Sequence, residues 1–297
     1  MKKTLAMMTA AMMVAGALAG CGSSSSTPAA TTAAATEAAT TAAATDAATT
    51  EAAGDTAAAA EGTVKTPSGK FTVGFDQEFP PMGFVGDDGQ FTGFDLDLAK
   101  EVASRLGLEF VPQPINWDAK DMELDSGNID CIWNGFTMQG REDAYTWVGP
   151  YMANNQVFVV TADSDIASKA DLAGKAVEVQ KDSSGLAALQ GEAELSASFG
   201  SMTEVADYNT ALMDLESGAC DAVCMDSIVA GYQIKSSGKD MKILDDTLAA
   251  EEYGIGFKKG EDALAKAVHD TLMDMKDDGT VAKISNDWFG SDVFTLK

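Results

Sequence analysis

The segments "MELDSGNIDCIW" (residues 122–133) and "MDLESGACDAVC" (residues 213–224) decide the fold, because the second repeats the first. Each copy has the spacing of a helix, then a glycine that ends it, then a short run typical of a buried strand. Two copies of one helix–strand unit predict a chain built from two similar α/β series. The matched positions are Met122, Leu124, Ser126, Gly127, Asp130 and Ile132 in the first copy and Met213, Leu215, Ser217, Gly218, Asp221 and Val223 in the second.

Strand and helix patterns alternate around each copy, an order that favours an α/β fold with a mostly parallel sheet flanked by helices. Ligands of such sheets bind beyond the carboxyl ends of the strands. The repeated strands end at Asn134-Gly135 and at Met225-Asp226, so these ends would meet in one cleft if the two series face one another. The expected strands lie at 70–75, 108–115, 129–135, 175–180, within 202–208, and at 220–225; the expected helices are 94–107, 119–127, 183–195 and 209–218.

Two further segments would connect the two series. They are "QVFVVTAD" (156–163) and "EEYGIGFKKG" (251–260), and Gly254 and Gly256 give the second freedom to bend. The remaining segment, 262–290, has the pattern of two helices that Asp278-Gly279 separates.

The N-terminal region has the layout of an exported protein. In residues 1–20, two lysines precede an apolar run that is too short to span a membrane, as in a secretory signal peptide. The run ends in Leu-Ala-Gly-Cys21, which resembles the lipobox of bacterial lipoproteins, where the cysteine carries the lipid. The alternative is a plain secretory signal with an incidental cysteine. Residues 21–66 are rich in Ala, Thr and Ser, so we expect a disordered tether between Cys21 and the folded part.

The composition argues against some kinds of partner. The formal net charge is −26, and removal of residues 1–20, which hold two lysines and no acid, would make it −28. Such a surface repels phosphate backbones, so we expect no nucleic-acid binding. Three cysteines follow Cys21 without the spacing of a metal site, and we interpret Cys131, Cys220 and Cys224 as small buried apolar residues. We therefore expect neither a metal nor a cofactor.

Six segments occur in a fixed order across residues 68–292. They are "GFDQEFPPMGF" (74–84), "TGFDLDLAKEVASRLG" (92–107), "SGNIDCIWNGFT" (126–137), "VEVQKDSSG" (177–185), "DAVCMDSIVAGY" (221–232) and "DGTVAKISNDWFG" (278–290). Together they resemble the family-3 solute-binding proteins of amino-acid ABC transporters, the group of the glutamine- and histidine-binding proteins. The resemblance implies the two-lobe, type II periplasmic-binding-protein-like fold with two hinge strands. Lobe 1 would comprise 67–158 and 254–297, and lobe 2 would comprise 159–253.

The resemblance also implies a function. The protein would be a monomeric, extracytoplasmic receptor, anchored by lipid on Cys21, that closes on a polar amino acid. It would deliver the amino acid unaltered to a membrane permease driven by an ATPase, so we expect no enzymatic activity. A lyase or dehydratase on the same fold is the alternative from the enzyme class. A sensor-type binding protein is a third possibility.

Two charged residues would hold the ends of an amino-acid zwitterion, because each buried charge needs a fixed opposite charge. Arg141 matches the family's carboxylate-binding arginine, and a guanidinium can hold a carboxylate with two hydrogen bonds. Asp226 matches the family's ammonium-binding aspartate. The alternative role for Arg141, one of only two arginines, is a surface ion pair with Glu142 or Asp143.

Several neighbours would complete the carboxylate site. Thr137 and the chain after it look like the start of a helix, whose free N–H groups attract anions. Ser183 and Ser184 resemble a turn of lobe 2 that adds further donors. Many relatives have five positions from the threonine to the arginine, whereas Thr137 and Arg141 are four apart. This difference bears on the geometry of the carboxylate site.

The remaining site residues would contact the ligand's side chain and ammonium group. Phe79 and Trp117 match aromatic residues of the pocket, although each could instead belong to the core. Asn134 and Gly135 match the strand end that meets the ammonium group, and whether neighbouring Trp133 faces the ligand or the core stays open. Asp76 matches a residue that contacts polar ligand side chains, which favours a cationic or amide ligand; a turn-capping role is the alternative.

Overall fold

The computed structural model describes residue 66 and residues 68–297. The predicted signal peptide, Cys21 and the tether up to residue 65 lie outside the described residues. Within the described part of the chain, no helix is both long and apolar enough to cross a membrane.

The first α/β unit, which we define as residues 70–144, has the predicted strand–helix alternation. Each helix ends at a glycine in the left-handed conformation, as the sequence predicts: Gly107 after the first and Gly127 after the second. The elements are β1 (Lys70–Phe75), α1 (Phe94–Leu106), β5 (Glu109–Pro114), the 3₁₀ turn η1 (Trp117–Ala119), α2 (Lys120–Ser126) and β6 (Cys131–Thr137). A small sheet that was not predicted, β2 (Glu78–Phe79), β3 (Gly83–Val85) and β4 (Phe91–Thr92), lies between β1 and α1 in the sequence.

The second α/β unit, which we define as residues 176–237, follows the same scheme with two differences. The helix predicted over 183–195 is two helices that meet at Glu192, whose backbone is not helical. A helix that was not predicted, α6, follows directly after Asp226. The elements are β8 (Ala176–Gln180), α3 (Ser184–Gly191), α4 (Ala193–Ser198), β9 (Ser201–Val205), α5 (Tyr208–Ser217), β10 (Ala222–Asp226) and α6 (Ser227–Ser237).

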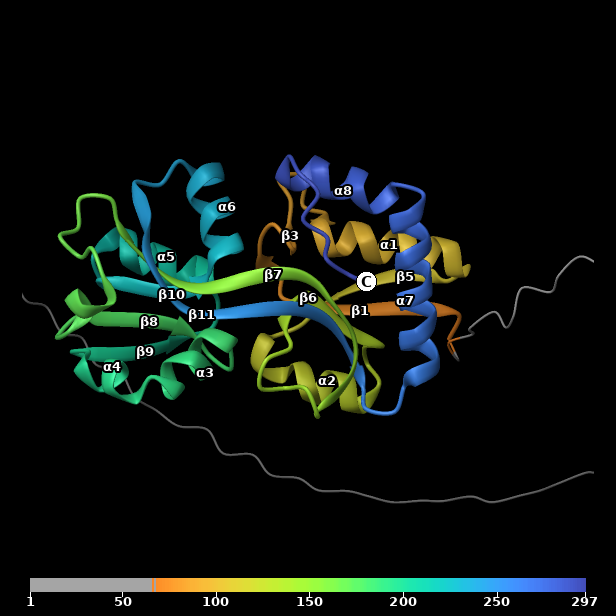
Figure 1. The fold of residues 1–297 in the computed structure, drawn as a ribbon, viewed down its shortest axis with the longest axis horizontal. Coiled ribbons are helices and arrows are strands. Elements are labelled where there is room, and N and C mark those ends of the chain that lie inside the picture. The colour runs from red at the N-terminus through yellow and green to blue at the C-terminus, as the bar shows by residue number, and fades with distance from the viewer. Residues whose placement is uncertain (1–65, 67) are drawn as a thin grey trace, which may run out of the picture. The chain divides into compact units, whose positions relative to one another are not determined.

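Two long antiparallel strands, β7 (Tyr145–Thr161) and β11 (Met241–Lys258), connect the units. They lie in the middle of one eight-stranded sheet with the order β5-β1-β6-β11-β7-β10-β8-β9. In this sheet, the neighbouring strands that come from the same unit are parallel. Figure 1 shows β7 and β11 crossing from one unit to the other. The connecting segments predicted at 156–163 and 251–260 are therefore parts of much longer strands. The turn η2 (Lys169–Leu172) follows β7.

The internal repeat is confirmed at the level of single hydrogen bonds. Asp130 accepts a hydrogen bond from the backbone N–H of Thr72 in β1 at 2.6 Å. Its counterpart, Asp221, accepts one from the backbone N–H of Ala176 in β8 at 2.8 Å. Each repeated aspartate thus ties the loop before its strand to the neighbouring parallel strand, so the repeat encodes the same local structure twice.

The last two helices pack on the first unit. In α8 (Thr280–Phe289), Trp288 donates to Asp97 at 2.8 Å and the ring of Phe289 lies 5.1 Å from that of Phe94. Helix α7 (Asp262–Asp277) ends before Gly279, as predicted. Cys131, Cys220 and Cys224 are buried and free, which confirms their interpretation as apolar residues.

Candidate functional site

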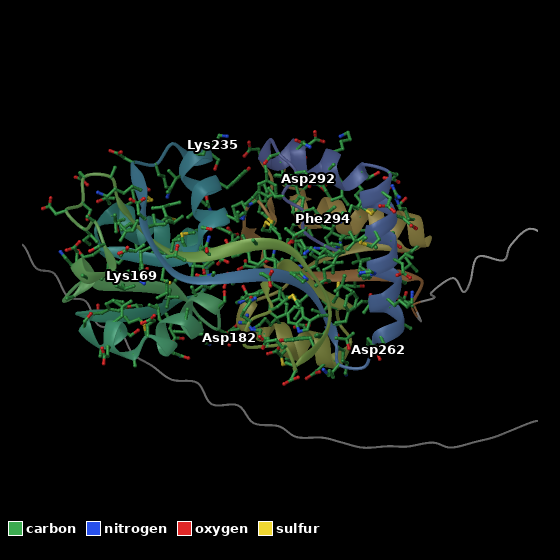
Figure 2. All side chains as sticks on the ribbon, in the orientation of Figure 1. Lys169, Asp182, Lys235, Asp262, Asp292 and Phe294 are labelled. Atoms are coloured by element: carbon green, nitrogen blue, oxygen red, sulfur yellow. The ribbon has the colours of Figure 1, made fainter. Side chains whose placement is uncertain are left out.

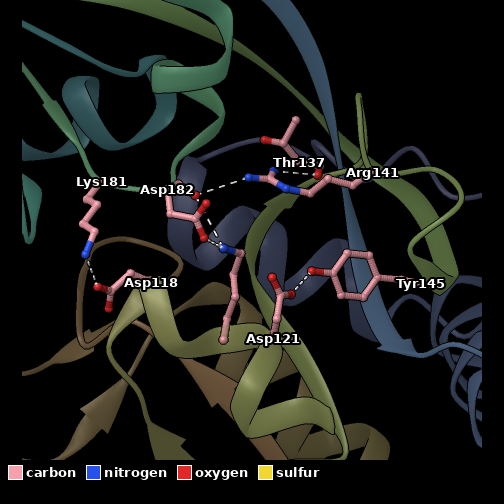
Figure 3. A network of polar contacts seen from close by, with 8 residues as sticks. Asp118, Asp121, Thr137, Arg141, Tyr145, Lys181 and Asp182 are labelled. Carbon is pink, nitrogen blue, oxygen red and sulfur yellow. Dashed lines mark hydrogen bonds and ion pairs between the residues drawn. The ribbon is translucent and has the colours of Figure 1, made fainter. Parts of the chain in front are cut away.

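Polar side chains of the two units meet directly. Each pair joins a residue of the first unit to one of the second, so the units lie close together along the carboxyl ends of the repeated strands. The pairs are Asp76 with Gln180, Glu78 with Asn209, Asp118 with Lys181, Lys120 with Asp182, Thr137 with Ser184, and Arg141 with the carbonyl of Asp182. Figure 3 shows the last of these contacts beside the Asp118–Lys181 ion pair.

Within the described residues, the guanidinium of Arg141 donates only to carbonyl oxygens. Its guanidinium donates to the carbonyl of Thr137 at 3.2 Å and to that of Asp182 at 3.4 Å, and it lies 5.1 Å from the centre of the Phe136 ring. The chain between Thr137 and Arg141 forms turns, so the expected helix start is wrong. In the described part of the chain, no carboxylate forms an ion pair with Arg141, neither that of Glu142 nor that of Asp143.

The other arginine provides a contrast. The guanidinium of Arg105 forms ion pairs with Glu101 at 2.9 Å and with Asp278 at 2.6 Å. Arg105 is thus neutralised by its own protein on the surface of α1. Arg141 remains available for an anionic ligand.

Lys120 is a second cation at this place, and sequence reasoning missed it. Its side chain is only 2 % exposed, and its ammonium group pairs with the carboxylate of Asp182 and lies 5.2 Å from the centre of the Trp117 ring. Asp182, labelled in Figures 2 and 3, is the only non-glycine residue with a positive φ (55°) among the described residues. The sequence did contain a signal that Lys120 is buried. Lys120 lies four positions before the buried Leu124, so the two share one face of α2.

Asp226, at the end of β10, is buried among hydrogen-bond donors. It accepts from Tyr253 at 2.7 Å, from Asn154 at 2.7 Å and from Tyr208 at 3.1 Å. Burial, followed by the nearby carboxylate of Glu251, raises the pKa of Asp226 well above its ordinary range. The three donors hold Asp226 in place, and no lysine or arginine of the described residues forms an ion pair with it.

A chain of hydrogen bonds joins the two charged ends of the site. The hydroxyl of Thr137 donates to that of Ser184 at 3.1 Å, and the amide of Gln156 donates both to Ser184 at 3.1 Å and to Glu251 at 2.9 Å. The amide of Asn154 then donates to both Glu251 and Asp226. One continuous network thus runs from Thr137, whose carbonyl accepts from Arg141, to Asp226.

Ser183 and Ser184 have different roles. The hydroxyl of Ser183 accepts from the backbone N–H of Leu186 at 3.1 Å and so caps α3. That of Ser184 faces the first unit, where it meets Thr137. Of the two predicted hydroxyl groups, the structure brings Ser184 to the network and uses Ser183 to start a helix.

Asn134 and Gly135 lie inside β6, which continues to Thr137 and is therefore longer than the strand predicted at 129–135, and both are tightly packed. The amide oxygen of Asn134 accepts from the backbone N–H of Asp76 at 3.0 Å, while its buried amide nitrogen has no hydrogen-bond partner in the described structure. Gly135 has a φ of 55°, and a Cβ there would lie 3.0 Å from the Phe79 ring and 3.1 Å from that of Tyr253. Glycine is therefore required at this position by both backbone and space.

The backbone of Gly135 is held by a buried carboxylate. Its N–H donates to Asp95 at 2.7 Å, and the hydroxyl of Tyr151 donates to the same carboxylate. Trp133 is fully buried in the hydrophobic core, with its ring 6.4 Å from that of Tyr151. The question left open by the sequence is thereby answered, since Trp133 faces the core.

Asp76 lies between the units. It accepts from Gln180 at 2.7 Å and from the backbone N–H of Glu78 at 2.9 Å, so it also has the turn-capping role considered for it. Burial raises its pKa to about 6, and the nearby carboxylates of Asp207 and Glu78 act in the same direction. A cation placed beside Asp76 would stabilise its charged form.

The two predicted aromatic residues, Phe79 and Trp117, both make ring contacts in this region. The ring of Phe79 lies 5.8 Å from that of Tyr208 in the second unit. Trp117 is nearly buried, makes an edge contact with Phe136 and carries the Lys120 ammonium group over its face. Both rings therefore lie close to cross-unit contacts, although Trp117 also belongs to a small apolar cluster.

A cavity of about 1030 Å³ opens between the units beyond Asp76 and Trp117. Arg141, Asp226, Thr137 and Ser184 do not line it. Its charged lining residues are the acids Asp76, Glu78, Asp118, Glu123, Glu204 and Asp207 and one base, Lys181. Since Lys181 is paired with Asp118 at 2.7 Å, the cavity is strongly acidic. It would favour a positively charged group over a negative one.

Sequence reasoning missed several polar residues of the network. Glu251, Asn154 and Gln156 lie on the two long connecting strands. Tyr208 and Tyr253 donate to Asp226, and Gln180 donates to Asp76. Asn154, Gln156 and Glu251 are also buried. Their roles depend on the pairing of β7 with β11. Gln156 and Glu251 are 95 positions apart in the sequence, so no local pattern shows that they meet.

The chain is similar to known proteins over most of its described length. Residues 71–291 match the family model described as bacterial extracellular solute-binding proteins, family 3. The L-cystine-binding protein TcyJ of Escherichia coli is 31 % identical over 231 residues, covering 76 % of this chain and 84 % of that protein. The histidine-binding periplasmic protein of Salmonella typhimurium is 29 % identical over 245 residues, covering 76 % of this chain and 89 % of that protein.

A solved structure has a similar fold. It is the substrate-binding protein of an ABC uptake transporter from Streptococcus pneumoniae with bound histidine. The TM-score is 0.74 and the sequence identity 34 %, over 77 % of this chain and 95 % of that one.

Proposed function

We propose that this chain, which belongs to the bacterial extracellular solute-binding proteins of family 3, is the receptor of an ABC importer that closes its two lobes around a polar amino acid. The lobes would comprise 67–158 with 254–297, and 159–253. Arg141 would bind the ligand's carboxylate, with Thr137, Ser183 and Ser184 beside it. Asp226 would bind the ammonium group, next to Asn134 and Gly135. The names of the relatives describe proteins that bind cystine and histidine.

One observation carries the proposal. In the described part of the chain, Arg141 and Asp226 each lack an ion-pair partner, although a single hydrogen-bond network connects their surroundings. Leaving two opposite charges unneutralised costs free energy unless a ligand supplies their partners. An amino-acid zwitterion carries those two partners on one carbon atom.

The ligand's side chain would extend past Phe79 and Trp117 toward Asp76. The acidic cavity beyond Asp76 supports a ligand with a cationic or amide side chain, because it has five carboxylates besides Asp76 and one lysine that is already paired. An aromatic face can also hold a cation or an aliphatic stem. Acidic amino acids would be repelled.

The predicted export signals fit this role. A lipid on Cys21 and the tether of residues 21–66 would keep a monomeric receptor at the outer face of the cell membrane, within reach of the permease and its ATPase. The relatives described above include a periplasmic protein, and the family is extracellular.

A thermal-shift screen of the twenty standard amino acids, cystine and ornithine tests the proposal. We expect a rise in melting temperature with one or a few polar amino acids, because a ligand that binds only the folded state stabilises it. If none of these compounds shifts the transition, the protein is not an amino-acid receptor of this kind.

The enzyme alternative requires a separate test. The described relatives are binding proteins, which favours a receptor. Mass spectrometry of the bound amino acid after long incubation distinguishes the two functions. A receptor leaves the ligand's mass unchanged, whereas a lyase or dehydratase would convert it.

A further inference from the structure

A second buried carboxylate lies next to Asp226. Asp226 is 3 % exposed and Glu251 is 5 % exposed. The amide nitrogen of Asn154 donates to both, at 2.7 Å and 2.6 Å. A shared donor holds the two carboxylates side by side, at the place proposed for the ligand's ammonium group.

The groups around this pair carry no positive charge. Tyr208 from α5 and Tyr253 from β11 donate to Asp226, and burial raises the pKa of both hydroxyls well above 10.0, so they stay neutral. Burial likewise keeps the thiol of Cys224, on β10, protonated by raising its pKa well above 9.0.

The neighbours on β7 are uncharged amides. Asn154 and Gln156 donate to Glu251, and the amide oxygen of Gln156 is buried without a partner. Within the described residues, neither Asp226 nor Glu251 forms an ion pair.

Two adjacent carboxylates cannot both ionise in such surroundings, because like charges repel strongly where water is excluded. The free pair therefore holds one proton and a net charge of −1. Burial and the proximity of Glu251 raise the pKa of Asp226 to about 8, in agreement with this.

We propose that Glu251 is a second acceptor for the ligand's ammonium group and that ligand binding expels the proton that the Asp226–Glu251 pair holds in the free protein. The inference rests on the proposed function. One carboxyl O–H bond breaks, the proton passes to solvent, and the ammonium group keeps its own three protons. The pair changes from −1 to −2 while the ligand adds +1, so the net charge of this part of the site stays at −1.

The position of Glu251 gives this exchange a structural role. Glu251 lies on β11 and its partners Asn154 and Gln156 lie on β7, the two strands that connect the units. Gln156 also donates to Ser184 at the contact with the first unit. Ionisation of the pair would therefore change the charge at β7 and β11, the strands about which the lobes would close.

Titration calorimetry at pH 7.5 in two buffers of different ionisation enthalpy counts the released protons. The probe is L-arginine, or L-glutamine if arginine does not bind, because neither titrates near this pH. We expect the wild type to release more than about half a proton per ligand. Glu251→Gln should release clearly fewer protons than the wild type, because Asp226 then has no carboxylate beside it and only burial still favours its protonated form.

Glu252→Gln is the matched control, since Glu252 is the exposed neighbour of Glu251 on the same strand. It should release as many protons as the wild type. Between pH 6.5 and 7.5 the apparent Kd of the wild type should fall about tenfold, since one proton is displaced per ligand, and that of Glu251→Gln should fall less.

Ligand binding by the wild type without proton release overturns the inference, whether or not Glu251→Gln folds. Equal proton release by the wild type and Glu251→Gln overturns it as well. If neither amino acid nor any compound of the thermal-shift screen binds, the proposed function itself fails, which is a distinct outcome.

Discussion

The hydroxyl of Thr137, at the end of β6, lies 3.1 Å from that of Ser184, at the start of α3. The two residues are 47 positions apart and belong to different α/β units. Their contact brings the first unit, with Arg141, to the second unit, with Asp226, and so defines the site between them.

Arg141→Ala should abolish the thermal shift produced by every amino acid that stabilises the wild type. Loss of a charged hydrogen-bonding partner costs about 1.5–3 kcal/mol, and the ligand's carboxylate would also be left buried without its cation. Arg105→Ala is the control, because Arg105 is neutralised by Glu101 and Asp278 away from the site. An undiminished shift with Arg141→Ala would show that the carboxylate binds elsewhere.

Asp76→Asn should change the order in which amino acids bind, with cationic ligands losing most. Asp226→Asn should weaken all of them alike, since every amino acid has the ammonium group. Burial raises the pKa of Asp76 to about 6, so cationic ligands should also bind more tightly as the pH rises through 6. Calorimetry with arginine, ornithine and glutamine measures both effects. Uniform weakening by Asp76→Asn would rule out this role.

Much of the fold could be predicted from the sequence, because local signals and the global fold agree. The repeat at 122–133 and 213–224, the glycine stops and the alternating strands and helices all appear in the structure. The break at Glu192 was missed although Gly191 directly precedes it, because apolar residues continue on both sides. The length of β7 and β11 depends on their pairing with each other, which no local pattern encodes.

The site could be predicted only in part. A residue at a strand end, such as Asp226 at the end of β10, follows from topology. The roles of Lys120 and Glu251 arise from contacts between distant segments, with Asp182 and with Asn154. The role of a buried charge of this kind can be assigned only when the residues that contact it are known.

Lys120 and Asp182 should contribute jointly to closure of the lobes. Lys120 is buried, so removal of Asp182's charge leaves it without its anionic partner. We expect Lys120→Met and Asp182→Asn each to weaken ligand binding, and the double variant to be less impaired than the sum. The coupling in a double-mutant cycle should be about 0.5–3 kcal/mol. Strict additivity of the two changes would mean that Lys120 and Asp182 contribute to lobe closure independently.

The stability of the protein should fall as the pH rises from 4 to 7. Burial raises the pKa of Asp95 from 3.8 to about 7, so the folded state binds a proton that the unfolded state has lost in this range. The contribution of Asp95 to the free energy of unfolding is complete below pH 3.8 and is lost toward pH 7. In between, the free energy of unfolding falls by up to about 1.4 kcal/mol per pH unit. Urea unfolding measures the free energy of unfolding at pH 5 and at pH 7. The difference between these two values should be smaller for Asp95→Asn than for the wild type. Equal differences would exclude Asp95 as the source.

The most direct test of the account compares one amino acid with its two truncated analogues. Using the tightest ligand of the thermal-shift screen, calorimetry would measure the Kd of the amino acid, of the amine without its carboxylate, and of the acid without its ammonium group. The account predicts that each analogue binds at least about tenfold more weakly, because each leaves Arg141 or Asp226 without its partner. Binding of either analogue as tightly as the amino acid would contradict it.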